Sequence, residues 1–468
     1  MVLGIEGRSV VGNLRNVVSW SFRVTAFVLF FASTSAAPLV AQEVPPANAE
    51  PAVEVVEPPA VAVEAAKKVD TTVYAEPRVT AEEESKWRSS NQIKLQSALK
   101  AIAPTNAETK TLIDGANMFV DKMTIPKYRA DLHRNVVDPA RRSVEGQLTQ
   151  PKPRGILLKA ITDRSLELLA QNPAHHPDVQ LNLVILLGTL NAKVAETNSP
   201  AVPYTGSSKV LITVLEDPAR PLQCRISAAT GLGRMGREAV VGAENGDLSV
   251  VQRAEIASSL AKVLIATDAQ GNEDGKVWFR SRVAEALGDC GIAFDLNKGS
   301  GLIDALLTAA TNPAEHLRVR AASLRASTQL AWNGTINAPL VLHECMKLQL
   351  TVAQQYNAAI LVNKAAVPAN LNHANFEIYL CFRPKTAQQG NVLKWGLLNQ
   401  STRPGLGQHT PAITAAYAVA LPVIQHIVAN PKKPVPVPAP LIAALETWIK
   451  DNPPQNRKPT TMSPNEMP

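Results

Sequence analysis

Aromatic side chains are scarce in this chain of 468 residues, in which phenylalanine, tryptophan and tyrosine together make up 4%. Strands of a β-sandwich favour aromatic and β-branched residues, and an extended surface that stacks sugars needs many aromatic rings. The composition therefore argues against both. It suits helices that pack through small side chains.

Cysteine is also scarce, and its spacing excludes two kinds of site. Cys224, Cys290, Cys345 and Cys381 stand far apart, with no C-x-x-C or C-x-x-C-H motif, so neither a metal ribbon nor c-type haem attachment is supported. One disulfide is compatible with an oxidising compartment. Cys345 with Cys381 is the preferred pair because both lie in the C-terminal third, and buried free thiols are the alternative.

A hydrophobic run long enough for a confident membrane span is missing from the N-terminal region. The largely apolar run Val24–Ala32 has nine residues, whereas a span needs about 20. Arginines precede this run and small residues follow it, with Ala36 or Ala41 as the last residue before cleavage. This pattern predicts an export signal over residues 1–41, and an uncleaved anchor is the alternative.

A helical pattern is present instead, and it recurs five times. The copies begin at Gln180, Arg225, Arg280, Arg318 and Gln355, at intervals of 45, 55, 38 and 37 residues. In the second copy, positions i, i+3, i+4 and i+7 are Arg225, Ala228, Ala229 and Leu232, which share one helix face. Periods of about 20–50 residues predict a stacked repeat array.

A second helix is expected before each copy, over residues 155–169, 209–215, 251–265, 302–309 and 339–348. Asn172-Pro173, Asp217-Pro218 and Asn312-Pro313 supply turns between paired helices, because proline stops one helix and can open the next. The third copy lacks such a turn. The longer intervals predict insertions near residues 198–208 and 268–275.

Glycines close three of the copies. Gly188, Gly233 and Gly288 stand at the last position of the pattern, and Asn363 stands there in the fifth copy. Both residue types tolerate the left-handed backbone just past a helix end. We therefore expect these glycines to end their helices, and the stretch 231–236 to be a helix terminus rather than a phosphate-binding loop.

The unit Asp217-Pro218…Cys224-Arg225…Ala228-Ala229…Leu232-Gly233 resembles a HEAT repeat, and the resemblance covers about residues 155–365. The stretch from His176 to Asn191 is also similar to exported HEAT-like proteins of planctomycete bacteria. The resemblance implies an all-α fold, a right-handed α-α superhelical solenoid of helix pairs (ARM-like) with disordered N- and C-terminal segments.

The chain is accordingly divided into six parts. They are a signal peptide (1–41), a disordered linker rich in proline, alanine and glutamate (42–84), a helical capping region (85–150), the HEAT-like repeats (151–365), a C-terminal helical region (366–430), and a proline-rich spacer with a short helix and a disordered tail (431–468).

Charge is distributed unevenly along the chain. The total is +7, of which residues 1–42 carry +2 and residues 43–84 carry −7, which leaves +12 for the remainder. A basic body behind an acidic tether attracts anionic partners through its field. The alternative is a spread of lysines and arginines over outward helix faces.

Arg225, Arg280 and Arg318 recur at one repeat position. An arginine there can bind the preceding turn, for instance the carboxylate of Asp217 in the case of Arg225, or backbone carbonyls. We expect these arginines to tie neighbouring units together rather than to face a ligand.

Two clusters contain residue types that occur in catalytic or metal sites. His175, His176 and Asp178 lie in a turn, where such residues are ordinarily solvated or act as caps. His343-Glu344-Cys345 lacks the second histidine of a zinc-protease helix, because Lys347 stands in its place. We therefore predict no catalytic, cofactor-binding or metal-binding residue, and no cofactor.

The function predicted from these features is that of an exported, non-enzymatic helical-repeat protein. It would act as a protein-binding scaffold in the periplasm or cell envelope of a bacterium, with another envelope protein as its partner. One alternative is electrostatic binding of an anionic envelope polymer or lipid surface. A lyase-like HEAT-repeat enzyme is a further alternative. Neither nucleic acid nor a small-molecule substrate is indicated.

Overall fold

The computed structural model describes residues 73–146, 149–195, 201–241, 248–266, 273–362, 367–383, 396–429 and 433–461. All of them belong to one unit of the chain, Thr71–Pro468. Helices make up 74% of the structure and strands 3%, which agrees with the predicted all-α class. The predicted signal, residues 42–72 of the predicted linker, Asn363 and residues 462–468 lie outside the described residues.

The first helix, α1 (Ala81–Leu99), begins inside the range 42–84 predicted as linker. Thr80 caps it through a capping box with Glu83, in which each side chain accepts the other residue's backbone N–H. Glu84, in the first turn of this helix, is buried. The acidic run therefore supplies the start of a folded helix, and the linker prediction extends too far.

A short helical segment separates α1 from the helix pairs that follow. Thr105 and Glu108 form a second capping box at the start of its first helix. The elements of this segment are α2 (Asn106–Asp121), η1 (Lys122–Thr124), η2 (Pro126–Asp131), η3 (His133–Val137) and α3 (Asp138–Glu145).

Four helix pairs come next along the chain. They are α4 (Pro151–Leu169) with α5 (Pro177–Thr189), α6 (Ser208–Glu216) with α7 (Leu222–Val241), α8 (Val250–Ile265) with α9 (Glu273–Cys290), and α10 (Gly301–Thr311) with α11 (Leu317–Gln329). The predicted proline turns lie between the helices of three pairs. In two of them the side chains of Asp217 and Asn312 accept a backbone N–H two residues on and close the turn.

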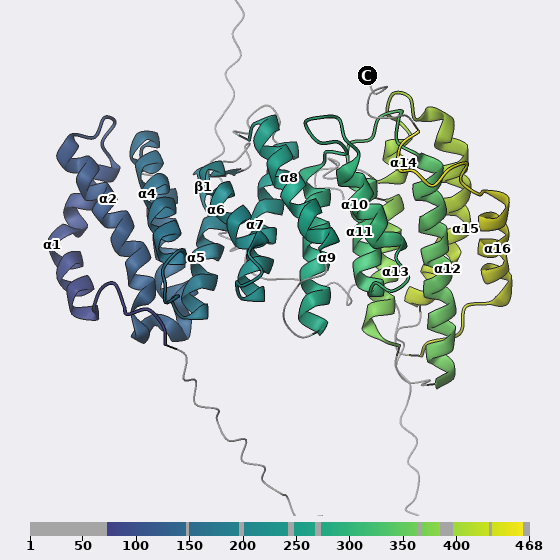
Figure 1. Ribbon diagram of the computed structural model, residues 1–468, viewed down its shortest axis with the longest axis horizontal. Helices are drawn as coiled ribbons and strands as arrows, with labels where there is room; N and C mark the ends of the chain where they lie inside the picture. Colours follow the sequence, from purple (N-terminus) through teal and green to yellow (C-terminus); the bar gives the residue numbers. More distant parts are fainter. Residues whose placement is uncertain are drawn as a thin grey trace, which may run out of the picture. The chain divides into compact units, whose positions relative to one another are not determined.

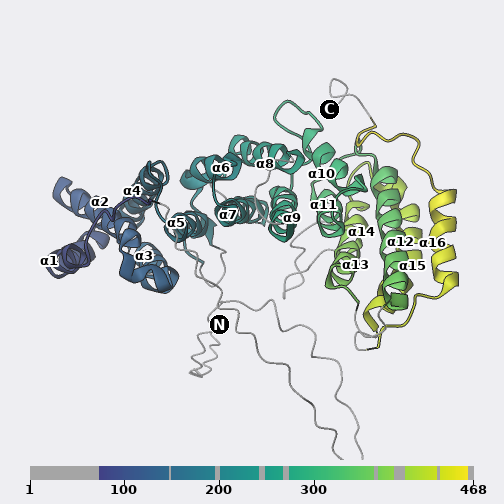
Figure 2. The ribbon, with the colours of Figure 1, turned by 60° about the horizontal axis from the view of Figure 1, so that its bottom comes forward.

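The second helices of the pairs lie side by side in one row. Contacts run from α5 to α7, from α7 to α9, from α9 to α11, and from α11 to α13 (Ala369–Phe382). The first helices α6, α8 and α10 form a second row that packs on the first, as Figure 2 shows. Neighbours along each row therefore follow the order of the chain (Figure 1).

Gly188, Gly233 and Gly288 do not stand just past the ends of their helices, so this prediction is wrong. Gly188 and Gly288 lie within α5 and α9, where the backbones of adjacent helices meet. A Cβ built on Gly188 would be 3.0 Å from Cα of Gly231, and one on Gly288 would be 2.8 Å from Cβ of Ala326. These residues are small because a neighbouring helix touches them.

The glycine-rich stretch 231–236, which includes Gly233, is also interior to a helix. It lies in the middle of α7, and α6 rather than a strand precedes it. A glycine in the left-handed conformation stands directly after α9 instead: Gly291, with a φ of 69°. The helix-end position is therefore three residues later than the pattern placed it at Gly288.

Two of the recurring arginines hold the turn that precedes their helix. Arg225 donates from Nε to the carbonyl of Leu215 at 2.9 Å. Arg280 donates from Nη1 to the carbonyl of Ala266 at 2.7 Å, and its Nη2 pairs with Glu315 in the next turn at 2.6 Å. These two residues bind within the structure, as expected.

In the fourth copy the predicted arginine is the wrong one. Arg320, not Arg318, donates to the carbonyl of Ala310, at 3.1 Å. The predicted carboxylate partner of Arg225 is also different, since Asp217 pairs with Arg220 at 3.1 Å. Sequence spacing located the helices, but not the register of each side chain within them.

The fifth copy is part of one continuous helix rather than a helix pair. α12 (Ala338–Val362) contains both segments that were expected to pair, because neither proline nor glycine interrupts it. It is followed by α13, α14 (Leu397–Gln400), η5 (Gly407–His409), α15 (Thr410–Ala429) and α16 (Ala439–Asp451). The C-terminal part is thus a cluster of helices around α12.

The C-terminal tail up to Thr461 is folded against the body, whereas disorder was predicted from residue 451 onward. The N–H of Asn337 donates to the carbonyl of Pro459 at 2.8 Å, and the N–H of Thr461 donates to that of Thr335, also at 2.8 Å. These long-range bonds could not be anticipated from the local composition of the tail.

Two further features concern single segments. The insertion expected near residues 198–208 contains β2 (Val202–Pro203), which pairs in antiparallel fashion with β1 (Asn191–Lys193) just before it. In the described part of the chain, only Gly407–Ala429 is long and apolar enough to cross a membrane. This is weak support for a span, because a packed core helix passes the same test, and α15 packs against α12, α13 and α16.

Candidate functional site

The histidine cluster before α5 is structural. His176 caps the helix, with its Nδ1 accepting the N–H of Asp178 at 3.2 Å. His175 is buried, and its Nε2 lies 2.9 Å from Oε1 of Gln171. Burial and nearby arginines lower the pKa of His175. Across the described ranges no group of three or more His, Cys, Asp or Glu side chains could hold a metal ion.

The three residues of the motif His343-Glu344-Cys345 likewise contact separate parts of the structure. His343 Nδ1 lies 3.1 Å from the carbonyl oxygen of Asn452, so it anchors the end of α16. Glu344 pairs with Lys347 at 3.1 Å, which is the residue that interrupts the zinc-protease spacing. Cys345 points into the core.

The four cysteines are buried free thiols in this structure. The thiol groups of Cys345 and Cys381 are hydrogen-bonded to each other, so the pair preferred from the sequence is indeed adjacent. Burial raises the pKa of Cys345, and it raises the pKa of Cys224 and of Cys290 to about 12. None of these three is suited to act as a thiolate nucleophile.

A groove of about 540 Å³ lies between α1, α2 and the segment from η2 to α3. We call it the N-terminal groove. It is lined by Glu84, Trp87, Arg88, Gln92, Leu95, Gln96, Leu99, Met118, Phe119, Lys122, Tyr128, Arg134, Asn135, Val136, Pro139 and Ser143.

The base of the N-terminal groove is a fixed ionic cluster. Lys122 Nζ lies 3.2 Å from Glu84 Oε1, and the Tyr128 hydroxyl donates to Glu84 Oε2 at 3.3 Å. Lys122 also lies over the Tyr128 ring, 4.7 Å from its centroid, a favourable cation–π arrangement. The buried carboxylate of Glu84 is thereby satisfied.

Apolar and cationic side chains share the walls of this groove. Trp87, Phe119 and Met118 are half-buried, which leaves part of each open to the groove. Arg88 and Arg134 are exposed at the rim, and neither has a carboxylate partner within the described residues. The lining therefore combines aromatic, methionine and arginine side chains with an excess of positive charge.

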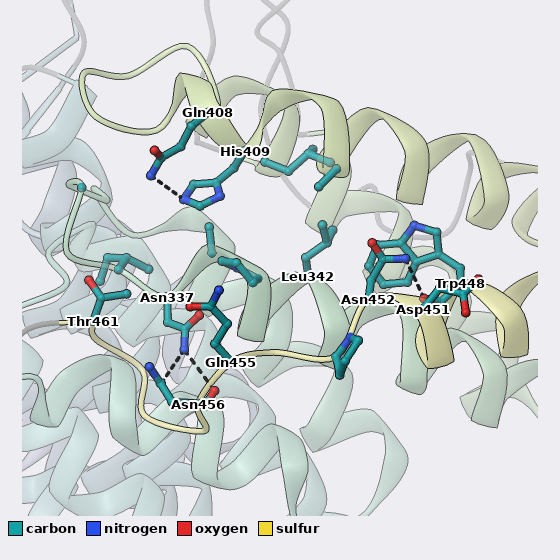
Figure 3. Close-up of a pocket in the computed structure, with 17 residues that line it drawn as sticks. Asn337, Leu342, Gln408, His409, Trp448, Asp451, Asn452, Gln455, Asn456 and Thr461 are labelled. Carbon is teal, nitrogen blue, oxygen red and sulfur yellow. Dashed lines mark hydrogen bonds between the residues drawn. The ribbon is translucent and has the colours of Figure 1, made fainter.

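A second hollow of about 560 Å³ lies at the other end of the helix series, and we call it the C-terminal pocket (Figure 3). The starts of α12 and α15, the end of α16 and the tail surround it. Its apolar lining includes Leu342, Ile413 and Trp448, all of them buried. Its polar lining is formed by Asn337, Gln408, His409, Asp451, Asn452, Gln455, Asn456 and Thr461.

The tail wall of the C-terminal pocket is fastened by Asn337. Its Nδ2 donates to Oδ1 of Asn456 and to the carbonyl of Lys458, both at 2.8 Å. Its Oδ1 accepts the N–H of Leu340 at 3.2 Å at the start of α12. One asparagine thus joins segments about 120 residues apart in the chain.

On the opposite wall, Gln408 and His409 come from η5. The side-chain nitrogen of Gln408 lies 3.3 Å from Nε2 of His409 (Figure 3). Burial lowers the pKa of His409, so the imidazole is neutral at neutral pH and offers both a donor and an acceptor.

Neither hollow was predicted from the sequence. The residues of each come from three or more separated segments, and their spacing matches no motif. The aromatic residues of the groove give no signal either, because Trp87, Phe119 and Tyr128 are spread over 42 residues and residues 376–417 are richer in aromatics. No protein family, curated protein or solved structure matches this chain.

Proposed function

We propose that the protein is an exported, non-enzymatic helical-repeat scaffold that binds another envelope protein. The helix pairs stacked in two rows are compatible with a HEAT-type solenoid, the architecture that the repeat pattern predicts. The run at residues 24–32, with its basic leader, supports export. Binding would involve the N-terminal groove, whose composition is the observation that carries the proposal.

The composition of the groove is that of an interface core. Tryptophan, tyrosine, phenylalanine, methionine and arginine are the residue types enriched where proteins meet, and truncations of tryptophan, tyrosine and arginine give the largest losses of affinity. Trp87, Phe119 and Met118 are already ordered by packing, so less entropy is lost on binding. The partner proposed is an amphipathic helix that places apolar residues in the groove.

The charge of the groove favours an acidic partner. Lys122 and Glu84 neutralise each other at its base, whereas Arg88 and Arg134 at the rim remain unpaired among the described residues. Glutamate or aspartate on the polar side of the partner helix would meet these two arginines. Charges at the rim of an interface mainly raise the rate at which the partner associates and discriminate against partners of the wrong charge.

The electrostatic alternative, an anionic polymer or lipid surface, receives less support. Arg225 is buried and Arg280 is bound to a carbonyl and to Glu315. Arg164 and Arg325 pair with Asp121 and Glu377 on neighbouring helices. These arginines are used in stacking the helices and are not available to a polymer.

Charge reversal at the rim tests the proposal. The chain from Gln42 onward would capture an envelope protein from host extract, identified by mass spectrometry and then purified. Arg88→Glu with Arg134→Glu is expected to weaken its binding at least about tenfold by reversing the rim field. Binding would be measured by titration calorimetry at low and high salt.

Lys94→Glu with Lys110→Glu is the matched control. Both lysines are exposed on α1 and α2, outside the groove lining, and the change in net charge is the same. The control is expected to bind as the unmodified chain does. Equal losses in both variants, or recovery of only anionic polymer or lipid at low salt, would contradict a groove-specific protein partner.

A further inference from the structure

The C-terminal pocket is a formed cavity that the proposed scaffold function does not use. Its volume of about 560 Å³ falls within the range of about 300–1,000 Å³ typical of ligand sites. Its walls come from segments that are hydrogen-bonded to one another at Asn337, Thr335 and His343. A cavity fixed in this way loses little conformational freedom when it is filled.

The chemistry of the lining excludes several ligand classes. None of the described residues that line the pocket is a lysine or arginine, and Asp451 is its one carboxylate. A phosphate, sulfate or carboxylate ligand would therefore meet no cation and would be repelled by Asp451. A purely apolar ligand would leave the amide groups of the rim without partners, which costs free energy.

The rim of the C-terminal pocket instead carries both hydrogen-bond donors and hydrogen-bond acceptors. Gln455 and Gln408 carry amides, which donate and accept at once, and Asp451 accepts only. Within the described chain, the side chains of Gln455 and Asp451 have no hydrogen-bond partner, and both residues line the hollow (Figure 3). Hydroxyl groups, each of which both donates and accepts, match such a rim.

The floor adds a requirement for an apolar face. Leu342 and Ile413 close the floor at 2% exposure each, and the apolar lining side chains that remain exposed are Pro339, Ala412 and Pro453. A sugar ring carries hydroxyls around its edge and C–H groups on its faces. One sugar ring can therefore contact both the polar rim and the apolar part of the lining.

From this geometry we propose that the C-terminal pocket binds a neutral saccharide. A sugar ring packs its C–H face on the exposed apolar side chains of the lining. Its hydroxyls bond to the side chains of Asp451 and Gln455. The site is independent of the N-terminal groove.

Saturation-transfer NMR on the whole chain tests the proposal with a panel of neutral trisaccharides: maltotriose, cellotriose and tri-N-acetylchitotriose. At least one is expected to bind with a dissociation constant below about 1 mM, with the strongest transfer to ring C–H protons. Asp451→Asn with Gln455→Ala is expected to weaken this binding at least about tenfold, since both rim contacts are lost. Both side chains are exposed, so the fold is retained.

Two further variants separate the pocket from the rest of the surface. Ala412→Trp, at an exposed lining position, fills the hollow and is expected to abolish binding. Arg457→Ala, on the tail but outside the lining, is expected to leave it unchanged. The proposal is overturned if no trisaccharide binds, if the pocket variants bind as the unmodified chain does, or if the peptide Gly-Asn-Gly-Asn-Gly displaces the saccharide.

Discussion

At the scale of single residues, side chains that suggested chemistry are used to build turns. His176 caps α5, and His316 caps α11 in the same way, through Nδ1 and the N–H two residues on. Arg225 and Arg320 each bind the carbonyl ten residues earlier. The function of these residues is to fix the angle between the helices of a pair.

The cysteines give a direct prediction at this scale. Burial raises the pKa of the Cys224 and Cys290 thiols to about 12, and Cys345 and Cys381 are equally inaccessible. At pH 8 the folded chain is therefore expected to take up no iodoacetamide, because neither thiolate nor access is available. The denatured chain, without reductant, is expected to take up four alkyl groups by intact-mass measurement.

The matched control is Ser90→Cys, at an exposed position of α1. Its thiol should be labelled in the folded protein within the time of the assay. Uptake of only two groups after denaturation would mean that Cys345 and Cys381 are joined as a disulfide, contrary to the free thiols of this structure.

At the scale of helices, close backbone contacts hold the inner row together. Gly231 on α7 lies against Gly188 on α5, and a Cβ built on Gly231 would be 2.8 Å from Cα of Gly188. Backbone cannot move aside as a flexible side chain can. The spacing between the two helices is therefore set by the absence of a side chain.

Gly231→Ala is expected to destabilise the protein. In an open helix interior this change raises the free energy of unfolding by about 0.5–1 kcal/mol. Here the added methyl overpacks the interface with α5, which costs about 1–3 kcal/mol. Urea unfolding followed by circular dichroism would measure the difference.

Gly155→Ala is the matched control, and it is expected to change the free energy of unfolding in the opposite direction. Gly155 is in α4, and no neighbouring atom lies within 4 Å of an added Cβ. The free energy of unfolding of this variant is therefore expected to be about 0.5–1 kcal/mol higher than that of the unmodified chain. Equal effects of the two substitutions would show that α5 and α7 are not in close contact at Gly231.

The helices and their proline turns could be predicted from periodicity, because both signals are local. The position of Gly188 could not, since a glycine that ends a helix and one that meets a neighbouring helix give the same pattern. The fold of the tail depends on Asn337, which is more than 100 residues away. Long-range partners of this kind leave no trace in the local sequence.

At the scale of the whole molecule, both hollows lie in the irregular parts of the helix series. The N-terminal groove is built by α1, α2 and the segment from η2 to α3, and the C-terminal pocket by α12, α15, α16 and the tail. Regular units cover each other's faces, whereas end units lack a neighbour on one side and often depart from the repeat. Under the two proposals, the helix pairs from α4 to α11 lie between the two binding sites in the order of the chain.

The central claim is that a protein partner occupies the N-terminal groove, and hydrogen–deuterium exchange tests it most directly. Exchange would be followed by mass spectrometry in the chain alone and in complex with the captured partner. We predict slower exchange in α1, in α2 and over residues 126–145 on binding, with α5 to α11 unchanged. Protection confined to the α5–α11 row, with residues 81–145 unaffected, would contradict the account.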